Sequence, residues 1–284
     1  MSTIVIGSSG YLGSNLLHVF GSERIIRVTR SSLAPGLGCS IDLSSVVLDD
    51  SHPLFNMVPE RVYVLARPAE SDWTVNRRFY ENLQKLLQKW CGNQELKAVY
   101  FTSTSNVYSI KESGVKSRFS DHAPDGEYEY FKLEFELFLK YLHFARRNDV
   151  DFYVFRLPIA FGGIFSPENN GNQYIYSFIS SYEQGYAWEF HNVEEQTFGT
   201  SWVYTPDLVG KISSLEHIGG SFQIVNVASG FFTYRELHEM LVKRFGSRRV
   251  APLRLYRSRM EIENEFELES RSIEAEIDRY LGLD

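Results

Sequence analysis

A tyrosine and a lysine stand four residues apart in the run EYEYFKLEFE, residues 127–136. The run predicts a helix, and in a helix Tyr128 and Lys132 share one face, with Cβ atoms about 5–6 Å apart. A phenol has a pKa of about 10, too high for proton exchange at neutral pH, but a neighbouring ammonium group favours the phenolate. The pair is therefore suited to acid–base chemistry, although it also fits an amphipathic helix without a catalytic role.

Three glycines, Gly7, Gly10 and Gly13, lie between the first predicted strand and the first predicted helix. In a dinucleotide site the first permits a tight turn, the second lets the backbone approach a pyrophosphate, and the third lets helix pack on strand. The helix amides face the phosphate, so we add Tyr11 and Leu12 to the predicted cofactor contacts. A structural turn is the alternative for the glycines.

The end of the second predicted strand distinguishes the two dinucleotides, because an acidic residue there favours NAD and an arginine favours NADP. The sequence reads RVTRSS, with no Asp or Glu. Arg30, helped by Arg27 and Ser31, is suited to pair with a 2′-phosphate. We therefore predict a preference for NADP(H), with NAD(H) as the second option. A solvated surface charge is the alternative for Arg30.

Short apolar segments alternate with longer helical ones along the chain. Strands are predicted at residues 3–7, 24–30, 61–67, 97–105, 151–162 and 222–229, and helices at 11–20, 75–90, 127–147 and 233–246, the last between a Thr233 cap and a Gly246 stop. This alternation predicts an α/β protein with a doubly wound parallel sheet of the Rossmann type and a smaller C-terminal substrate lobe. We assign residues 1–162 and 201–229 to the NAD(P)-binding domain and residues 163–200 and 230–284 to the substrate-binding lobe.

The 284 residues carry 36 acidic and 29 basic side chains, for a formal charge of −7, and no concentrated basic patch, so no nucleic-acid partner is expected. Cys39 and Cys91 lie far apart, without Cys or His at metal-ligand spacing, which predicts neither a disulfide scaffold nor a metal site. No run approaches the roughly 18 apolar residues of a membrane span, and the N-terminus lacks the pattern of a signal peptide. We expect a soluble cytoplasmic protein. The acidic C-terminal run, residues 260–284, is helix-forming and predicts a solvated face.

Hydroxyl side chains in FTSTSNVYS, residues 101–109, precede the YxxxK helix. Together with the glycine turn, this order resembles the extended short-chain dehydrogenase/reductase family, in its sugar-nucleotide epimerase, dehydratase and ketoreductase branch. The resemblance extends over most of the chain, to about residue 240. It implies that Tyr128 is the catalytic acid–base residue, and that Lys132 tunes Tyr128 and holds the nicotinamide ribose.

The same resemblance assigns the reacting oxygen of the substrate to a hydroxyl four residues before Tyr108. Thr104 occupies that position, and its neighbours Ser103 and Ser105 are able to share the role. Such a hydroxyl, with Tyr128, would hold a carbonyl or alcohol oxygen while hydride passes to or from the nicotinamide.

Further contacts follow from the resemblance alone. Asp42 resembles the acidic residue that contacts the adenine, although it also fits a local cap. Ala66 in LARPAE would leave room for the cofactor, and Pro158 in FRLPIAFG would lie near the nicotinamide. Asn82 resembles an asparagine that supports the active-site backbone, and we assign Asn106 to the substrate.

One motif departs from the family pattern. Thr200 and Ser201 stand where many members carry an Arg-Asp pair whose arginine grips the substrate diphosphate, whereas Asp207 of the same motif is kept. We assign a replacement clamp to Arg254, with Arg235, Arg257 and Arg259 as alternatives, because a guanidinium can hold phosphate from another direction. A substrate without a diphosphate is the other explanation.

These features favour an NADP(H)-dependent oxidoreductase that reduces a ketone on a sugar, in particular a nucleotide-linked 4-keto-6-deoxy sugar. An epimerase that retains its cofactor is one alternative, and a cofactor-binding regulator with a vestigial site is another. Dehydration is disfavoured, because TSNVY lacks the acid pair that dehydratases carry after the threonine. In much of the family the two long helices, here 75–90 and 127–147, form a dimer interface, so the resemblance also implies a homodimer.

Overall fold

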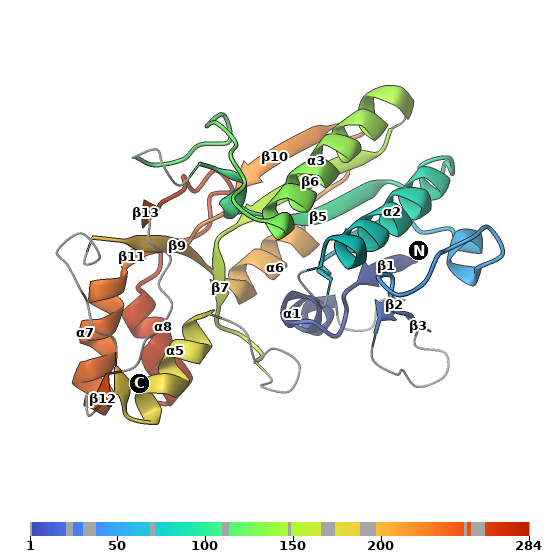
Figure 1. Ribbon diagram of the computed structural model, residues 1–284. Helices are drawn as coiled ribbons and strands as arrows, with labels where there is room; N and C mark the ends of the chain where they lie inside the picture. The colour runs from blue at the N-terminus through green and yellow to red at the C-terminus, as the bar shows by residue number, and fades with distance from the viewer. Residues whose placement is uncertain are drawn as a thin grey trace. The chain divides into compact units, whose positions relative to one another are not determined.

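Seven strands form the larger sheet, in the order β10-β6-β5-β4-β1-β2-β3 (Figure 1). The strands are β1 Thr3–Ile6, β2 Ile25–Thr29, β3 Gly38–Ser40, β4 Arg61–Val64, β5 Ala98–Thr104, β6 Asp151–Leu157 and β10 Phe222–Asn226. The pairs that join β3, β2, β1, β4 and β5 are all parallel. The strand order reverses around β1, and ligands of such sheets bind outside the carboxyl ends of the strands at that switch point. The predicted Rossmann-type fold is confirmed, and β3 is a strand that the sequence does not reveal.

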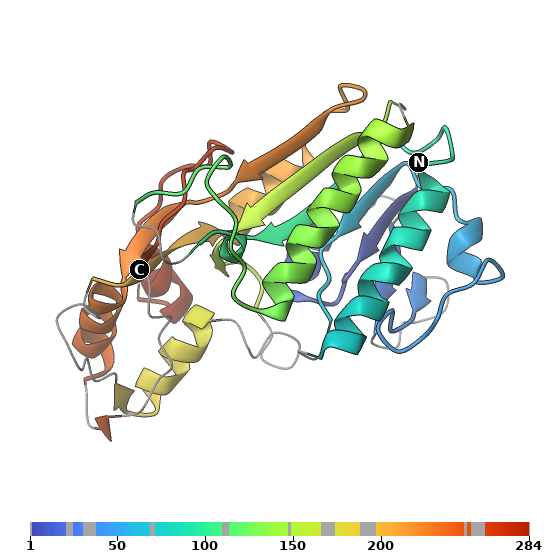
Figure 2. The same ribbon diagram turned by 45° about the horizontal axis from the view of Figure 1, so that its top comes forward.

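Helices cover both faces of this sheet. They are α1 Tyr11–Phe20, α2 Trp73–Trp90, α3 Glu127–Arg146 and α6 Thr205–Ser213, with short 3-10 turns η1 Pro53–Asn56 and η2 Ser105–Val107. α2 and α3 lie side by side on one face, and α1 and α6 lie on the other (Figures 1 and 2). Asp72 caps α2 by accepting from the amides of Thr74 and Val75 at 2.9 and 3.0 Å. The three helices predicted in this part of the chain are confirmed to within two residues at each end.

The computed structural model describes residues 2–20, 25–30, 38–68, 72–109, 114–146, 149–165, 174–187, 197–246, 249–250 and 259–283. The chain divides into two compact units. Unit 1 is Met1–Val107, Pro124–Arg156 and Val209–Val225, and unit 2 is Tyr108–Ala123, Leu157–Leu208 and Asn226–Asp284. The predicted NAD(P)-binding domain extends to residue 162, whereas this part of unit 1 ends at Arg156. The segment Tyr108–Ala123, predicted to lie in that domain, belongs to unit 2. The substrate-binding role of unit 2 stays a prediction.

The segment 151–162, predicted as one strand, is two strands in different sheets. β6 ends at Leu157, Pro158 follows, and β7 covers Ile159–Phe161. Proline has no N–H to donate to a strand ladder, so the β6 pairing ends there. β7 then pairs in parallel with β9, Gly199–Tyr204, in the smaller sheet of unit 2.

Unit 2 contains a four-stranded sheet of order β11-β9-β13, with β7 also paired to β9. Its further elements are β11 Gly230–Thr233, β13 Arg259–Met260, the pair β8 Tyr186–Ala187 and β12 Arg249–Val250, and the helices α5 Tyr174–Glu183, α7 Tyr234–Phe245 and α8 Ile273–Leu281. α7 begins after the predicted Thr233, which forms a capping box with Glu236, and ends at the predicted Gly246. Within the described part of the C-terminal run, residues 260–283, the helix is α8, and the prediction of a solvated acidic face is wrong at Glu276, which is 5% exposed.

An apolar cluster fixes α2 and α3 to the larger sheet. Leu83 and Leu86 of α2 and Phe135 of α3 are fully buried in it, together with strand residues such as Val62 and Phe101. This packing sets the position of the side chains on α3 relative to the strand ends. In the described ranges no helix is long and apolar enough to cross a membrane, and no group of three or more His, Cys, Asp and Glu side chains is arranged to hold a metal ion.

Candidate active site

The glycine turn has the geometry that the sequence predicts for a dinucleotide site. Gly7 adopts φ 89°, and a Cβ built on it would lie 2.7 Å from the Ala66 nitrogen. A Cβ on Gly13 would lie 2.1 Å from the Gly7 oxygen, so helix α1 approaches β1 as closely as glycine allows. A Cβ on Gly10 would meet only the Gly7 oxygen, at 3.3 Å. A side chain would thus clash with the backbone at Gly7 and Gly13, whereas Gly10 has more open space around it, which fits the approach of a pyrophosphate.

Helix α1 begins at Tyr11, directly after this turn. The Tyr11 carbonyl accepts from the side chains of Ser14 at 3.0 Å and Asn15 at 2.9 Å. The N-terminus of a helix favours anionic ligands, and the predicted cofactor contacts of Tyr11 and Leu12 at this end of α1 stay a prediction.

The end of β2 is tied to the glycine turn. The hydroxyls of Ser9 and Thr29 share a hydrogen bond, and Arg30 follows on an exposed bend. Asp42 accepts from the amide and hydroxyl of Ser44, at 3.0 and 2.5 Å, so its carboxylate stabilises a local turn. Its predicted contact with adenine stays a prediction.

Lys132 is buried on α3, with 2% of its surface exposed. Its Nζ donates to the Thr102 carbonyl oxygen at 2.7 Å and lies 5.6 Å from the centre of the half-buried Tyr128 ring. Burial, joined by the positive charge of Arg67, lowers the pKa of Lys132 to about 7, and Glu136 opposes this effect. A lysine with this pKa can gain or lose its proton near neutral pH.

A buried network lies one turn further along α3. Glu136 forms an ion pair with Arg156 of β6 at 2.6 Å, and the two side chains are 2% and 1% exposed. The hydroxyl of Ser103 donates to the other Glu136 oxygen at 2.5 Å. This network links α3, β5 and β6 beside Lys132. The sequence argument missed Glu136 and Arg156, and the only available signal was a glutamate four residues after Lys132.

The two hydroxyls proposed for the reacting oxygen have different surroundings. Ser103 points to Glu136, whereas Thr104 ends β5 and its Oγ1 accepts from the Asn106 amide at 3.2 Å. Because Thr104 acts as an acceptor there, its hydroxyl proton can be donated to a substrate oxygen. This geometry favours Thr104 over Ser103. The Asn106 side chain donates to Glu129, next to Tyr128, at 3.4 Å.

Two more residues near this site went unnoticed in the sequence. Tyr80 of α2 is 3% exposed and stacks on Phe131 with centroids 5.7 Å apart. Its hydroxyl is buried without a hydrogen-bond partner in the described part of the chain, and burial, with a smaller effect of Tyr128, raises its pKa. Arg67 is exposed after β4, and its charge reaches Lys132.

Asn82 is buried, and its side chain binds backbone groups. Its side chain binds the backbone of the segment 43–48, accepting from the Leu48 amide at 3.0 Å and donating to the carbonyls of Leu43 and Val46 at 2.7 Å each. Asn82 therefore fixes a loop that follows β3.

Unit 2 carries the departures from the family motif. Thr200 and Ser201 lie buried in β9, where Ser201 Oγ accepts from the Ile262 amide at 3.1 Å. Asp207 binds Arg271 through both oxygens, at 2.5 and 2.9 Å.

Four arginines were considered as a replacement for the missing phosphate clamp. Arg235 forms an ion pair with Glu239 at 2.8 Å, and Arg259 forms one with Glu261 at 2.6 Å. Arg254 and Arg257 lie outside the described residues. Pro158, which the resemblance places near the nicotinamide, is partly buried between β6 and β7.

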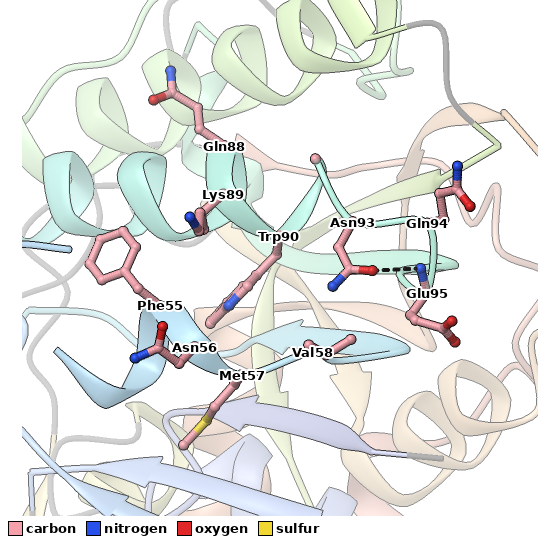
Figure 3. Close-up of a pocket in the computed structure, with 11 residues that line it drawn as sticks. Phe55, Asn56, Met57, Val58, Gln88, Lys89, Trp90, Asn93, Gln94 and Glu95 are labelled. Atoms are coloured by element: carbon pink, nitrogen blue, oxygen red, sulfur yellow. Dashed lines mark hydrogen bonds between the residues drawn. The ribbon is translucent and has the colours of Figure 1, made fainter. Parts of the chain in front are cut away.

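A hollow of about 800 Å³ in unit 1 is a different feature (Figure 3). It is lined by η1 and the residues after it, and by the C-terminal end of α2 and the turn that follows, with Phe55, Met57 and Trp90 among its side chains. These segments precede β4 and β5, so the hollow lies at the amino ends of the strands. Because ligands of doubly wound sheets bind at the carboxyl ends, we do not assign the active site to it.

Comparisons with known proteins agree with this fold. The sequence model of the NAD dependent epimerase/dehydratase family matches residues 3–228. No curated protein sequence matches the chain. A UDP-glucose 4-epimerase from Thermotoga maritima, solved with UDP-glucose, is 17% identical with a TM-score of 0.78, over 100% of this chain and 98% of that one.

Two further solved structures have the same fold. The dTDP-glucose 4,6-dehydratase DesIV from Streptomyces venezuelae, with NAD and TYD bound, is 18% identical with a TM-score of 0.77, over 100% of this chain and 96% of that one. A UDP-N-acetylglucosamine 4-epimerase from Methanobrevibacter ruminantium M1 is 16% identical with a TM-score of 0.78, over 99% and 97%.

Proposed function

The chain belongs to the NAD dependent epimerase/dehydratase family, and from this premise we propose that it is an NADP(H)-dependent oxidoreductase that reduces a keto group of a nucleotide-linked sugar. It is an enzyme of the extended short-chain dehydrogenase type. The choice of NADP(H) and of net reduction is specific to this proposal.

The observation that carries the proposal is Arg30. It follows β2 on an exposed bend, next to the hydrogen-bonded Ser9 and Thr29, and no described residue forms an ion pair with it. A guanidinium at this strand end is suited to the 2′-phosphate that distinguishes NADP from NAD. A reductase uses NADPH as an exchangeable reactant, whereas an epimerase retains its cofactor and returns the hydride.

Unit 1 supplies the groups that the reduction needs. Bound NADPH would supply the hydride, with the glycine turn suited to its pyrophosphate and Lys132 to its nicotinamide ribose. Thr104 donates a hydrogen bond to the ketone oxygen, which polarises the carbonyl. Tyr128 then delivers its proton to that oxygen, and the Lys132 ammonium stabilises the phenolate that remains.

A retained-cofactor epimerase is the second candidate. It is supported by the fold, which is shared with two 4-epimerases at TM-scores of 0.78, and it uses the same tyrosine, lysine and threonine. A non-catalytic NADP(H)-binding regulator is the third. The latter differs from both enzymes in that Tyr128→Phe leaves its function unchanged.

Calorimetric titration with NADPH and NADH tests the cofactor choice, after absorbance has shown whether the purified protein carries a dinucleotide. We expect an empty protein that binds NADPH more tightly than NADH, and Arg30→Ala to remove about tenfold of that preference. Arg77→Ala, which removes an exposed arginine of α2, is the matched control. Retained NAD, or NADH binding at least as tight as NADPH binding, would contradict the proposal and favour the epimerase.

We also propose a homodimer through α3. Tyr130, Leu137, Tyr141 and Phe144 recur at helical spacing on this helix and are 47%, 61%, 63% and 63% exposed. A stripe of this kind is suited to pack against a second copy of the helix. We expect Leu137→Glu with Tyr141→Glu to give a monomer in sedimentation, whereas Phe119→Glu, at an 81% exposed position outside α3, leaves the dimer intact. A monomeric wild-type protein at micromolar concentration would refute this assembly.

A further inference from the structure

Arg67 places a positive charge after the carboxyl end of β4. It follows Ala66, whose backbone packs against Gly7 of the glycine turn, and it is exposed. In the described part of the chain no carboxylate forms an ion pair with Arg67. Ligands of a doubly wound sheet bind at this edge, so the charge lies where a ligand is expected.

Arg67 and Glu136 have opposite electrostatic effects on Lys132. Arg67 lies close enough for its charge to disfavour the ammonium form of Lys132. Glu136, the carboxylate that favours the ammonium form, already binds Arg156 through both oxygens, at 2.6 to 3.2 Å. An anion beside Arg67 would balance this charge and favour the protonated lysine.

The sheet order separates this arginine from the expected 2′-phosphate of the cofactor, whereas the glycine turn expected to hold the pyrophosphate is its neighbour. The pyrophosphate belongs to the glycine turn after β1, and a 2′-phosphate to the end of β2, whereas β4 lies on the other side of β1 from β2. In unit 2, β9 carries Thr200 and Ser201 where many family members have the arginine that grips the substrate diphosphate. β9 therefore lacks the arginine of the family motif, whereas Arg67 provides a positive charge that reaches Lys132.

We propose that Arg67 binds an anionic group of the substrate, a phosphate or a sugar carboxylate, close to the carbon that exchanges hydride. This proposal rests on the proposed function, because it takes Tyr128 and Lys132 as the reacting centre. Guanidinium binds either oxyanion through paired hydrogen bonds. The substrate class becomes a nucleotide sugar whose negative charge reaches β4.

Calorimetry with four probes tests the proposal without requiring turnover. The probes are UDP-glucose, UDP-glucuronate and the corresponding dTDP-linked pair, each titrated with and without NADPH. We expect Arg67→Gln to weaken at least one probe by about 10- to 100-fold, the usual effect of removing a hydrogen bond to a charged group. Arg67→Lys retains part of the affinity, and Arg77→Gln, the exposed α2 control, retains all of it.

The pattern across probes identifies the anion. A loss confined to the glucuronates assigns the sugar carboxylate, and an equal loss for all bound probes assigns the phosphate. The proposal is overturned if Arg67→Gln binds every probe as the wild type does, if it weakens NADPH instead, or if the wild type binds none of the probes.

The same data separate this proposal from the reductase assignment. If anion binding depends on Arg67 but the protein never oxidises NADPH, the anion site is supported and the reductase assignment is rejected. If the protein is an active NADPH-dependent reductase and Arg67→Gln changes neither probe binding nor KM, the reductase assignment is supported and the anion site is rejected.

Discussion

Each unit of the molecule contains an arginine held by carboxylates, and the two clusters differ in exposure. In unit 1, Glu136 and Arg156 are 2% and 1% exposed and lie next to Lys132. In unit 2, Arg271 and Asp207 are 24% and 23% exposed, and Glu276, which also binds Arg271, is 4% exposed. The charges in unit 1 have lost almost all contact with water, whereas those in unit 2 keep part of it.

This difference indicates what each cluster contributes. A buried pair gains little over apolar residues of the same shape, but breaking it leaves an uncompensated charge inside the protein. The unit 1 pair is therefore suited to hold β5, β6 and α3 in one arrangement behind Ser103 and Lys132. The unit 2 cluster is partly solvated, so water can replace a lost partner and its removal is cheaper.

The largest expected effect is that of Glu136→Gln. It removes the negative charge that is paired with the buried Arg156 and is expected to lower the free energy of unfolding by about 3–5 kcal/mol, measured by urea denaturation. Glu81→Gln breaks the exposed Arg77–Glu81 pair of α2 and is expected to cost less than about 0.5 kcal/mol. If Glu136→Gln does not fold, the double variant with Arg156→Met should recover much of the loss. Equal effects of Glu136→Gln and Glu81→Gln would contradict the comparison.

Two phenol deletions should differ in sign between the units. Tyr108 of unit 2 donates to the Asn226 side-chain oxygen at 2.6 Å, so Tyr108→Phe leaves a buried acceptor unpaired and costs about 1–2 kcal/mol. The Tyr80 hydroxyl of unit 1 has no partner among the described residues, so Tyr80→Phe should stabilise the protein by about 1 kcal/mol. Thermal unfolding of both variants measures the contrast, and a loss of stability in Tyr80→Phe would show that its hydroxyl has a partner.

Asp207→Asn tests the partly solvated cluster. Hydrogen bonding by Asp207 raises the pKa of Arg271, and after allowance for solvent the substitution should cost about 1 kcal/mol. The cost should shrink in 1 M salt, where exposed charges are screened over about 3 Å, while that of Glu136→Gln should persist. The same salt dependence for both variants would remove the distinction between the clusters.

The smallest expected effect is on the pH dependence of the reaction. Lys132 has a pKa of about 7, so its ammonium form is lost as the pH rises through that value. The kcat/KM for reduction should therefore fall across this range, because less positive charge stabilises the phenolate of Tyr128. Arg67 lowers the pKa of Lys132, so Arg67→Gln should move the decline to higher pH. A profile that shifts to lower pH, or does not shift, would contradict this electrostatic link.

The features that could be predicted from the sequence are those that depend on the conformational preferences of single residues. Gly7 and Gly13 are dictated by close backbone contacts, and Thr233 and Gly246 by the requirements of helix ends, so their roles follow from residue type and position. Pro158 could have indicated the strand break, but the apolar run on both sides of it suggested one continuous strand. The local signal was present and was outweighed by hydrophobicity.

Pairings between distant segments were not predictable from one sequence. Glu136 and Arg156 lie on different elements, and charged residues are usually exposed, so nothing in the sequence marks them as buried partners. The same holds for Glu276, which reads as part of an acidic surface until Arg271 and Arg279 are placed beside it. Roles for Tyr128, Lys132 and Thr104 could be proposed because the order of these residues along the chain resembles a family.

The most direct test of the account follows the absorbance of NADPH while the protein acts on a nucleotide-linked 4-keto-6-deoxy sugar. We expect stoichiometric loss of NADPH with the wild type, and a rate at least about 100-fold lower with Tyr128→Phe, which keeps the ring and removes the proton donor. Tyr130→Phe, two residues away on α3, is the matched control and should react at the wild-type rate. No loss of NADPH with the wild type, or equal rates for wild type and Tyr128→Phe, would contradict the proposed reductase.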